Sequence, residues 1–276
     1  MPLEQQIERL LGLPADVARK EGFAVVQDFR AGLSRGELRA AEKTAGEWKT
    51  NIWVKRGILL AFRIGEIENR SVPTDFYFFD KDTLPPKPLT KTSGVRVVPG
   101  GSTIRDGAYV APNVICMPPM FINIGAYVDE GSMVDSHALV GSCAQIGKRV
   151  HLSAAAQIGG VLEPPGALPV IVEDEAFIGG NCGVYEGVLV QSRAVLAPGV
   201  ILTGGTAVYD LIREKVYRKT AEAPLTIPSG AVVVPGARPA TGDFASKHGV
   251  NLYTPVIVKY RDEKTDASTM LEQALR

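Results

Sequence analysis

Residues 123–147 carry the side chains best suited to chemistry, in a stretch otherwise rich in Gly, Ser and Ala. An ordinary aspartate has a pKa of about 3.9, so partial burial must raise that value before it can accept a proton near neutral pH. The polar positions of the stretch offer candidates for general acid–base chemistry if the fold shelters one of them. They are Asp129, Glu130, Asp135 and His137.

An aliphatic residue returns every six positions through this stretch and beyond it. Stepping by six from Val98 reaches eleven apolar residues in succession, ending at Ile158, and a mostly small residue lies four positions after each. Helices repeat at 3.6 residues and strands alternate at two, so neither explains this period. A six-residue period is typical of a solenoid in which each hexad forms one short strand and one corner, with its aliphatic residue toward the axis.

The period predicts a mainly β fold, a parallel β-helix of about six triangular coils. The rhythm breaks at residues 159–171 and 207–226 and resumes after each break. A corner is where residues can be inserted without disturbing the stacked strands, so both breaks should be loops that project from corners. We therefore assign residues 93–240 to the β-helix.

The remaining residues flank the predicted β-helix on both sides. Open ends of a solenoid expose unpaired backbone, so both flanks are expected to act as caps. Residues 1–92 indicate a small mixed, largely helical N-terminal domain, and residues 241–276 indicate a C-terminal cap.

Local patterns predict the elements of these flanks. Helical spacing of apolar residues predicts three helices, at residues 3–12, 14–32 and 51–64, with Gly32 ending the second. Residues 84–94 form a linker because their prolines disfavour helix. The C-terminal cap should hold a strand within residues 251–265 and a final helix at residues 266–276, N-capped by Asp266 or Ser268.

The composition argues against nucleic acid and membrane partners. Lys plus Arg and Asp plus Glu number 30 each, so the net charge is zero, and no apolar run approaches the length of a membrane span. The N-terminus has acidic residues where a signal peptide would be basic. Cys116, Cys143 and Cys182 lack metal-type spacing, and their odd number favours a reduced, cytoplasmic protein.

The hexads resemble those of the left-handed β-helix acyltransferases, which are trimers. Three segments are similar to the tetrahydrodipicolinate N-succinyltransferase family: NIGAYVDEGSMVDSHALVGSCAQIGKRVHLS, IGGVLEP and the closing VIVKYRDEKT. The resemblance implies a left-handed parallel β-helix and a homotrimer with active sites between subunits. It also implies transfer of a succinyl group from succinyl-CoA, a co-substrate, to the amine of ring-opened tetrahydrodipicolinate in diaminopimelate and lysine synthesis. No permanently bound cofactor is implied.

The resemblance assigns roles to three residues. Asp135 matches the family's active-site aspartate, which would contact the acceptor and take a proton from its amine. Arg96 matches a substrate-binding arginine, whose planar guanidinium suits a carboxylate. His137 stands where better-known members carry tryptophan, and could line the acceptor pocket or help to move a proton. The competing interpretations are a corner aspartate that hydrogen-bonds its own turn, a surface arginine and a surface histidine.

One position departs from the family pattern. Better-known members carry a second functional glutamate where this chain has Gly183. Glu186 lies three residues later and could approach the same pocket as a catalytic group, although it matches a different family glutamate. The departure also keeps open an acetyl group as the one transferred.

Coenzyme A carries phosphates, so its groove should collect cations and bare backbone amides. The candidate donor-binding residues are Gly204, Gly205, Arg238 and Lys247. The second break adds a run of cations that could instead be solvated surface: Arg213, Lys215, Arg218 and Lys219.

Two other functions compete with N-succinyl transfer. The first is acetyl transfer from acetyl-CoA to the same or a similar amine, and the second is a non-catalytic hexapeptide-repeat scaffold. Zinc chemistry of the kind found in carbonic anhydrases of this fold is not expected. The reason is that His137, His151 and His248 lack the close pair spacing of such a metal site.

Overall fold

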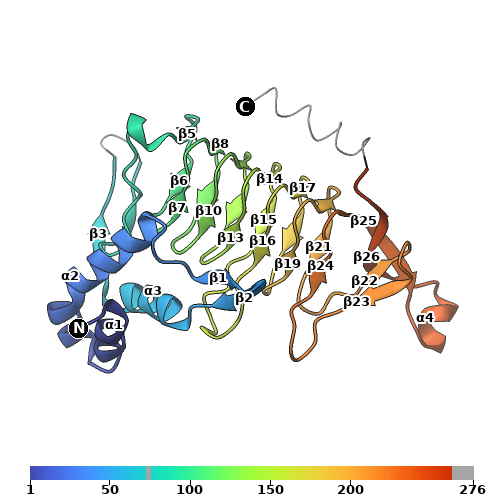
Figure 1. Ribbon diagram of the computed structural model, residues 1–276, viewed down its shortest axis with the longest axis horizontal. Coiled ribbons are helices and arrows are strands. Elements are labelled where there is room, and N and C mark those ends of the chain that lie inside the picture. Colours follow the sequence, from blue (N-terminus) through green and yellow to red (C-terminus); the bar gives the residue numbers. More distant parts are fainter. Residues whose placement is uncertain (73–75, 263–276) are drawn as a thin grey trace.

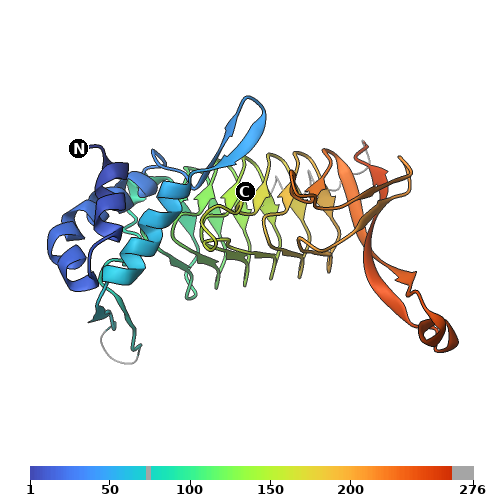
Figure 2. The ribbon, with the colours of Figure 1, turned by 90° about the horizontal axis from the view of Figure 1, so that it is seen from below.

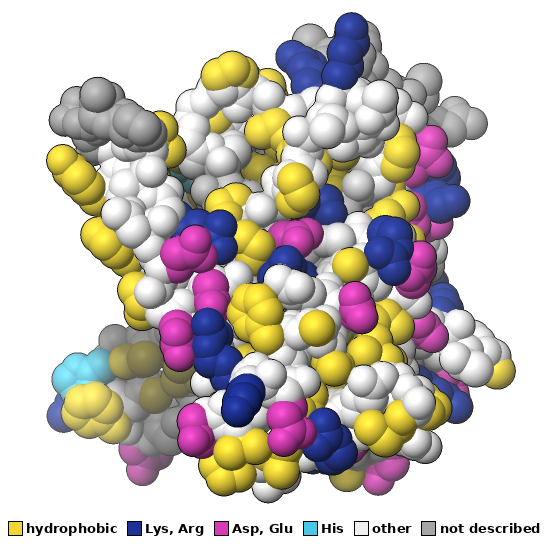
Figure 3. Space-filling view, turned by 90° about the vertical axis from the view of Figure 1, so that its left-hand side faces the viewer, with side chains coloured by type: hydrophobic (Ala, Val, Ile, Leu, Met, Phe, Trp, Pro, Cys, Tyr) yellow, Lys and Arg dark blue, Asp and Glu magenta, His cyan; other side chains and the backbone are white. Residues whose placement is uncertain are grey.

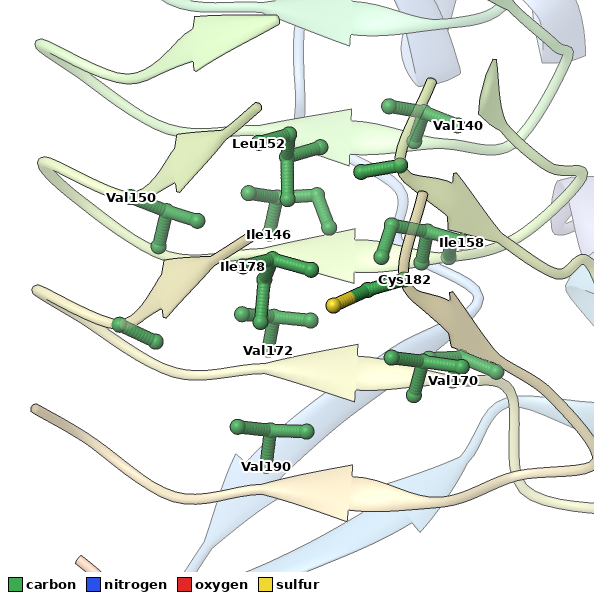
Figure 4. Close-up of a cluster of buried hydrophobic side chains, with 14 of the residues drawn as sticks. Val140, Ile146, Val150, Leu152, Ile158, Val170, Val172, Ile178, Cys182 and Val190 are labelled. Carbon is green, nitrogen blue, oxygen red and sulfur yellow. The ribbon is translucent and has the colours of Figure 1, made fainter. Parts of the chain in front are cut away.

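Aliphatic side chains at six-residue spacing fill the inside of a three-sided prism (Figure 4). The computed structural model describes residues 1–72 and 76–262. Each regular coil contains three two-residue strands, and Val128 pairs in register with Val110 of the preceding coil and Ile146 of the next. Burying one such side chain fully contributes about 1.5–3 kcal/mol. The interior row is therefore the main source of stability in this part of the chain.

Each face of the prism is a parallel sheet, named first, second or third in the order of β7, β8 and β9. The first face comprises β7 (Tyr109–Val110), β10 (Tyr127–Val128), β13 (Gln145–Ile146), β16 (Ile171–Val172), β19 (Leu189–Val190) and β24 (Thr226–Ile227). The second face comprises β5 (Arg96–Val97), β8 (Ile115–Cys116), β11 (Met133–Val134), β14 (His151–Leu152), β17 (Phe177–Ile178), β20 (Val195–Leu196) and the start of β25 (Ala231–Pro239). The third face comprises β6 (Thr103–Ile104), β9 (Phe121–Ile122), β12 (Leu139–Val140), β15 (Gln157–Ile158), β18 (Gly183–Val184) and β21 (Ile201–Leu202).

The inward positions predicted from the sequence are confirmed from Ile104 to Val233, all of them buried. The prediction for the first hexad is wrong, because Val97 and not Val98 pairs with Cys116. This first coil contains one residue more than the regular repeat. Gly100 and Gly101, with φ of 141° and 91°, turn the chain at the corner that holds the extra residue. Val97 remains 37% exposed at the open end of the core.

The loops at both predicted breaks project from the corner that joins the third face to the first. The first break connects β15 to β16 without a strand of its own. The second contains an antiparallel hairpin, β22 (Val208–Asp210) and β23 (Lys215–Tyr217). The hairpin was not expected from the sequence, and β22 also pairs with the C-terminal strand.

The N-terminal region is largely helical and packs against one end and one edge of the prism (Figures 1 and 2). Ile124 and Cys143 of the prism corner lie in the same buried cluster as the helices. The elements are α1 (Leu3–Leu11), α2 (Ala15–Ser34), β1 (Ala41–Thr44), β2 (Glu47–Thr50), α3 (Ile52–Ile64), β3 (Ile67–Asn69), β4 (Phe79–Lys81) and a 3₁₀ turn, η1 (Lys91–Ser93).

The three predicted helices are confirmed, but Gly32 does not end the second. Helix α2 continues to Ser34, and Gly32 is buried within it. A Cβ at Gly32 would lie 2.9 Å from the Leu38 side chain. The glycine therefore permits close packing of the following segment and does not mark the helix end.

The C-terminal hairpin of β25 and β26 continues the second face and extends away from the prism (Figure 1). Strand β26 (Asn251–Tyr260) pairs antiparallel with β25, and α4 (Asp243–Lys247) joins the two. The backbone N–H of Ile201, on the last strand of the third face, donates a 2.6 Å hydrogen bond to the Tyr253 hydroxyl. These contacts satisfy backbone groups that a further coil would otherwise pair. The final helix predicted at residues 266–276, with Asp266 or Ser268 as its cap, lies outside the described residues.

The surface at the N-terminal end mixes basic, acidic and apolar side chains without a region of one charge (Figure 3). No helix among the described residues is long and apolar enough to cross a membrane.

We expect the interior row to dominate the stability of the β-helix. Val128→Ala removes a fully buried side chain and should lower the free energy of unfolding by about 2–3 kcal/mol. Val97→Ala is the matched control at the exposed end of the core and should change it by less than about 1 kcal/mol. Chemical denaturation of the two variants measures the difference, and equal losses would contradict the packing described.

Candidate active site

The corner between the second and third faces presents Asp135 and His137. Asp135 follows the inward Val134 directly, so the turn after β11 directs it away from the core. Its Oδ1 accepts a 2.7 Å hydrogen bond from the backbone N–H of Ser136. Within the described residues Oδ2 has no hydrogen-bond partner. The half-buried carboxylate thus stabilises its own turn with one oxygen and keeps the other available.

His137 lies at the same corner, with its side chain exposed. Its φ of 62° is in the left-handed region, which few non-glycine residues adopt. Its backbone N–H donates to the carbonyl of Pro119 at 2.6 Å, and its carbonyl accepts from the Gln157 side chain at 3.1 Å. Bonds to the coils on both sides therefore fix the backbone of His137, while its imidazole faces outward.

Arg96 opens the second face two strands before the strand that leads to Asp135. Strands β5, β8 and β11 are neighbours in one sheet, and neighbouring strands lie about 4.8 Å apart. Arg96 therefore lies about 10 Å along the prism from the row of Met133. The Arg96 side chain is exposed, and no carboxylate in the described part of the chain pairs with it.

A second polar group occupies the corner between the third and first faces. Glu186 has a φ of 54° at this corner, and its Oε2 accepts a 2.9 Å hydrogen bond from the backbone N–H of Gly204. A Cβ at Gly204 would lie 3.0 Å from that carboxylate oxygen and 3.5 Å from Cδ of Lys219. Gly204 therefore lies close to both Glu186 and Lys219, and the neighbouring Gly205 is exposed. We call these four residues the glycine corner.

The loop of the first break supports the glycine corner from the N-terminal side. Lys55 is fully buried, and its Nζ donates a 2.6 Å hydrogen bond to the carbonyl of Ala167. Burial lowers the pKa of Lys55. The carbonyl of the next residue, Leu168, lies so close to Gly187 that a Cβ there would meet it at 2.5 Å. Lys55 thereby connects helix α3 to the turn that carries Glu186, a role that no sequence motif indicated.

The position of the missing glutamate is covered by an aromatic ring. Gly183 is buried on the third face, and a Cβ added to it would lie 2.5 Å from the Tyr185 ring. A larger side chain would have to displace that ring. Our sequence interpretation did not include Tyr185, although an aromatic residue two positions after a glycine on one outer face could have suggested the contact.

The remaining predicted donor residues lie in the C-terminal hairpin and the helix at its tip, away from the glycine corner. Arg238 pairs opposite Leu252 in the ladder of β25 and β26, and Lys247 ends α4. Neither has a hydrogen bond or ion pair with the glycine corner among the described residues. In the second break, the Arg213 guanidinium stacks at 3.9 Å over Tyr260. Of the cations in that break, Lys219 belongs to the glycine corner, because its Cδ lies close to Gly204.

The two polar corners are on different edges of one chain. The whole third face separates Asp135 from Glu186, and the two corners are two coils, or about 10 Å, apart along the prism. Three clefts of about 660, 630 and 250 Å³ lie around the N-terminal region. Neither of the two corner carboxylates lines any of these three clefts. A single chain therefore does not bring the predicted residues together in one pocket.

The three cysteines are buried, reduced and poorly suited to nucleophilic chemistry. Burial raises the pKa of Cys116 and of Cys143 to about 12, and that of Cys182 to about 11. Cys182 occupies a small-residue position of the coil, whereas Cys143 packs against the N-terminal helices. No cluster of three potential metal ligands occurs among the residues that the structure describes.

Comparison with known proteins extends over the whole chain. A family profile described as the tetrahydrodipicolinate N-succinyltransferase N-terminal region matches residues 2–64, and one described as a hexapeptide repeat of succinyl-transferase matches residues 169–204. A 2,3,4,5-tetrahydropyridine-2,6-dicarboxylate N-succinyltransferase of Legionella pneumophila is 43% identical, covering 99% of this chain and 96% of its own. Proteins of the same name from Acinetobacter baylyi and Dechloromonas aromatica are 44% and 40% identical, covering 95% and 100% of this chain and 91% and 98% of their own.

The prism and the repeat match define the class as a hexapeptide-repeat acyltransferase with the left-handed parallel β-helix that was predicted. Sequence identity above 40% over nearly the full length, together with the match to the N-terminal region, identifies one family within this class. The chain belongs to the 2,3,4,5-tetrahydropyridine-2,6-dicarboxylate N-succinyltransferase family.

We expect the cysteines to resist thiol reagents in the native state. A thiol with a pKa of about 11 or 12 is protonated at pH 8, and the thiolate is the reactive form. Ellman's reagent at pH 8 should therefore label the folded protein slowly and label all three cysteines after denaturation. Rapid labelling of the folded protein would contradict the burial described.

Proposed function

We propose that this protein transfers a succinyl group from succinyl-CoA to the amine of ring-opened tetrahydrodipicolinate, in the synthesis of diaminopimelate and lysine. The observation that carries the proposal is family membership over the full length of the chain. The free, reduced cysteines accord with a cytoplasmic location.

Asp135 is proposed as the group that accepts a proton from the amine. The neutral amine attacks the thioester carbon and a C–N bond forms. Asp135 takes the proton that the nitrogen then loses, the C–S bond breaks, and that proton passes on to the departing CoA thiolate. Asp135 suits this role because its Oδ2 is without a partner among the described residues, while Oδ1 is held by the turn.

The acceptor is proposed to lie along the second face between Arg96 and Asp135. Arg96 has the exposed, unpaired guanidinium that a substrate carboxylate needs. His137, exposed beside Asp135, would line the same site. The spacing of about 10 Å along the prism leaves room for an extended dicarboxylate.

The glycine corner is proposed to bind the donor. The exposed backbone of Gly205, with the Lys219 side chain close to Gly204, suits the phosphates and amide groups of coenzyme A. Glu186 holds this corner in place through Gly204 and is therefore a positioning residue in the proposal. Arg238 in β25 and Lys247 in α4 lie away from this corner and would close over the donor from the C-terminal segment.

A homotrimer is proposed because one chain separates the acceptor and donor corners. Three apolar side chains on the outer row of the second face are only partly covered in one chain: Met133, Phe177 and Val195. Packing this face beside another chain would bury them. It would also bring Asp135 of one chain toward the glycine corner of the next.

Acetyl transfer remains the second candidate, because Gly183 removes a carboxylate that better-known members carry. A direct comparison of transfer from the two CoA esters decides between them.

The assignment of Asp135 is tested by release of CoA thiol with each donor and the acceptor. Asp135→Asn should lower kcat with succinyl-CoA by about 10²–10⁴-fold, the usual contribution of a general base. Asp129→Asn is the matched control, because Asp129 accepts an equivalent hydrogen bond from the following backbone N–H, at 2.8 Å, on a different corner. Full activity of Asp135→Asn would remove this residue from the chemistry, and no transfer by the unmodified protein would favour a scaffold.

The trimer is tested by sedimentation equilibrium at micromolar concentration. We expect a mass of three chains, about 88 kDa from 29.5 kDa per chain. A monomer at this concentration would contradict a site shared between neighbouring chains.

A further inference from the structure

We infer that the Tyr185 hydroxyl binds the free carboxylate of the transferred acyl group and so selects a succinyl over an acetyl donor. The inference rests on the proposed function, because it assigns the acyl-selecting residue of the same site. Tyr185 directly precedes Glu186, so it lies where the third face meets the glycine corner.

Two glycines leave room for the Tyr185 ring to lie against the outer surface of the third face. A Cβ at Gly183 would lie 2.5 Å from Cε2 of the ring and 2.9 Å from the hydroxyl oxygen. A Cβ at Gly159, one coil earlier, would lie 2.7 Å from Cδ1. Real Cβ atoms essentially never approach other atoms within 3.0 Å. Residues without a Cβ at both positions therefore allow the ring its place.

The hydroxyl is directed back along the third face, away from the corner. It lies over Gly183, whose other close neighbour is Cδ1 of Ile201, at 3.0 Å from the same Cβ position. Tyr185 is half-buried, and its hydroxyl has no hydrogen-bond partner within the described part of the chain. A neutral phenol beside an apolar side chain can donate one hydrogen bond to a bound group.

Succinyl and acetyl groups differ at the end remote from the thioester. Succinyl extends by two further carbon atoms and ends in a carboxylate, whereas acetyl ends at its methyl group. With the donor at the glycine corner, a longer acyl group can run along the third face over Gly183. A phenol O–H donating to a carboxylate forms a charge-assisted hydrogen bond, which is stronger than a neutral one. Acetyl offers no partner, so the hydroxyl discriminates between the two.

Tyr185→Phe tests the inference because it keeps the ring and removes only the hydroxyl. We expect kcat/KM for succinyl-CoA to fall about tenfold or more, as for the loss of one hydrogen bond to a charged group. The value for acetyl-CoA should change by less than about twofold. Gly183→Ala displaces the ring and should lower the succinyl-to-acetyl ratio in the same direction.

Tyr109→Phe is the control for loss of a phenol hydroxyl elsewhere. Tyr109 stacks on Tyr127 with ring centroids 4.5 Å apart on the first face, and its variant should leave the donor ratio unchanged. Melting temperatures of all variants verify that they fold. An unchanged ratio in Tyr185→Phe, or an equal loss with both donors, would overturn the inference. Failure of the unmodified protein to use either donor would overturn the proposed function, and this assignment with it.

Discussion

The structure depends on burying one aliphatic side chain in every hexad while each backbone strand pairs with the coils on both sides. Together these requirements fix the regular coil at three hexads, because Val128 must stand in register with Val110 and Ile146. Insertions are then confined to corners, where neither the ladder nor the core is disturbed. The largest insertions and the polar side chains suited to catalysis or binding are accordingly found at corners, and flat faces remain between them.

This constraint also separates the groups that the proposed reaction needs. Asp135 and Glu186 belong to different corners, and the rigid third face holds them apart. A flexible hinge could not bring them together without breaking the ladder, so the proposed trimer brings them together between neighbouring chains. The N-terminal helices contribute from outside the prism, since buried Lys55 secures the loop that supports the turn of Glu186. The proposed mechanism and assembly therefore follow from the same requirement as the core packing, namely regular coils with in-register strand pairing.

The sequence predicted the interior well, because periodic burial leaves a direct trace in residue type. It failed where a single contact overrides the pattern. The extra residue of the first coil moved Val97 into the place expected for Val98, and packing against Leu38 kept Gly32 inside a helix.

The site was harder to predict than the fold. Asp135 and Arg96 could be named through resemblance, but their separation from the glycine corner depends on which edge each hexad occupies. The contact of Tyr185 with Gly183 and Gly159 joins two coils, and a position-by-position interpretation does not reveal it. A structure of the assembled protein with succinyl-CoA bound tests the account most directly. We predict that the donor contacts the glycine corner of one chain while Asp135 of a neighbouring chain faces its thioester carbon. A donor bound entirely within one chain, or far from every Asp135, would contradict it.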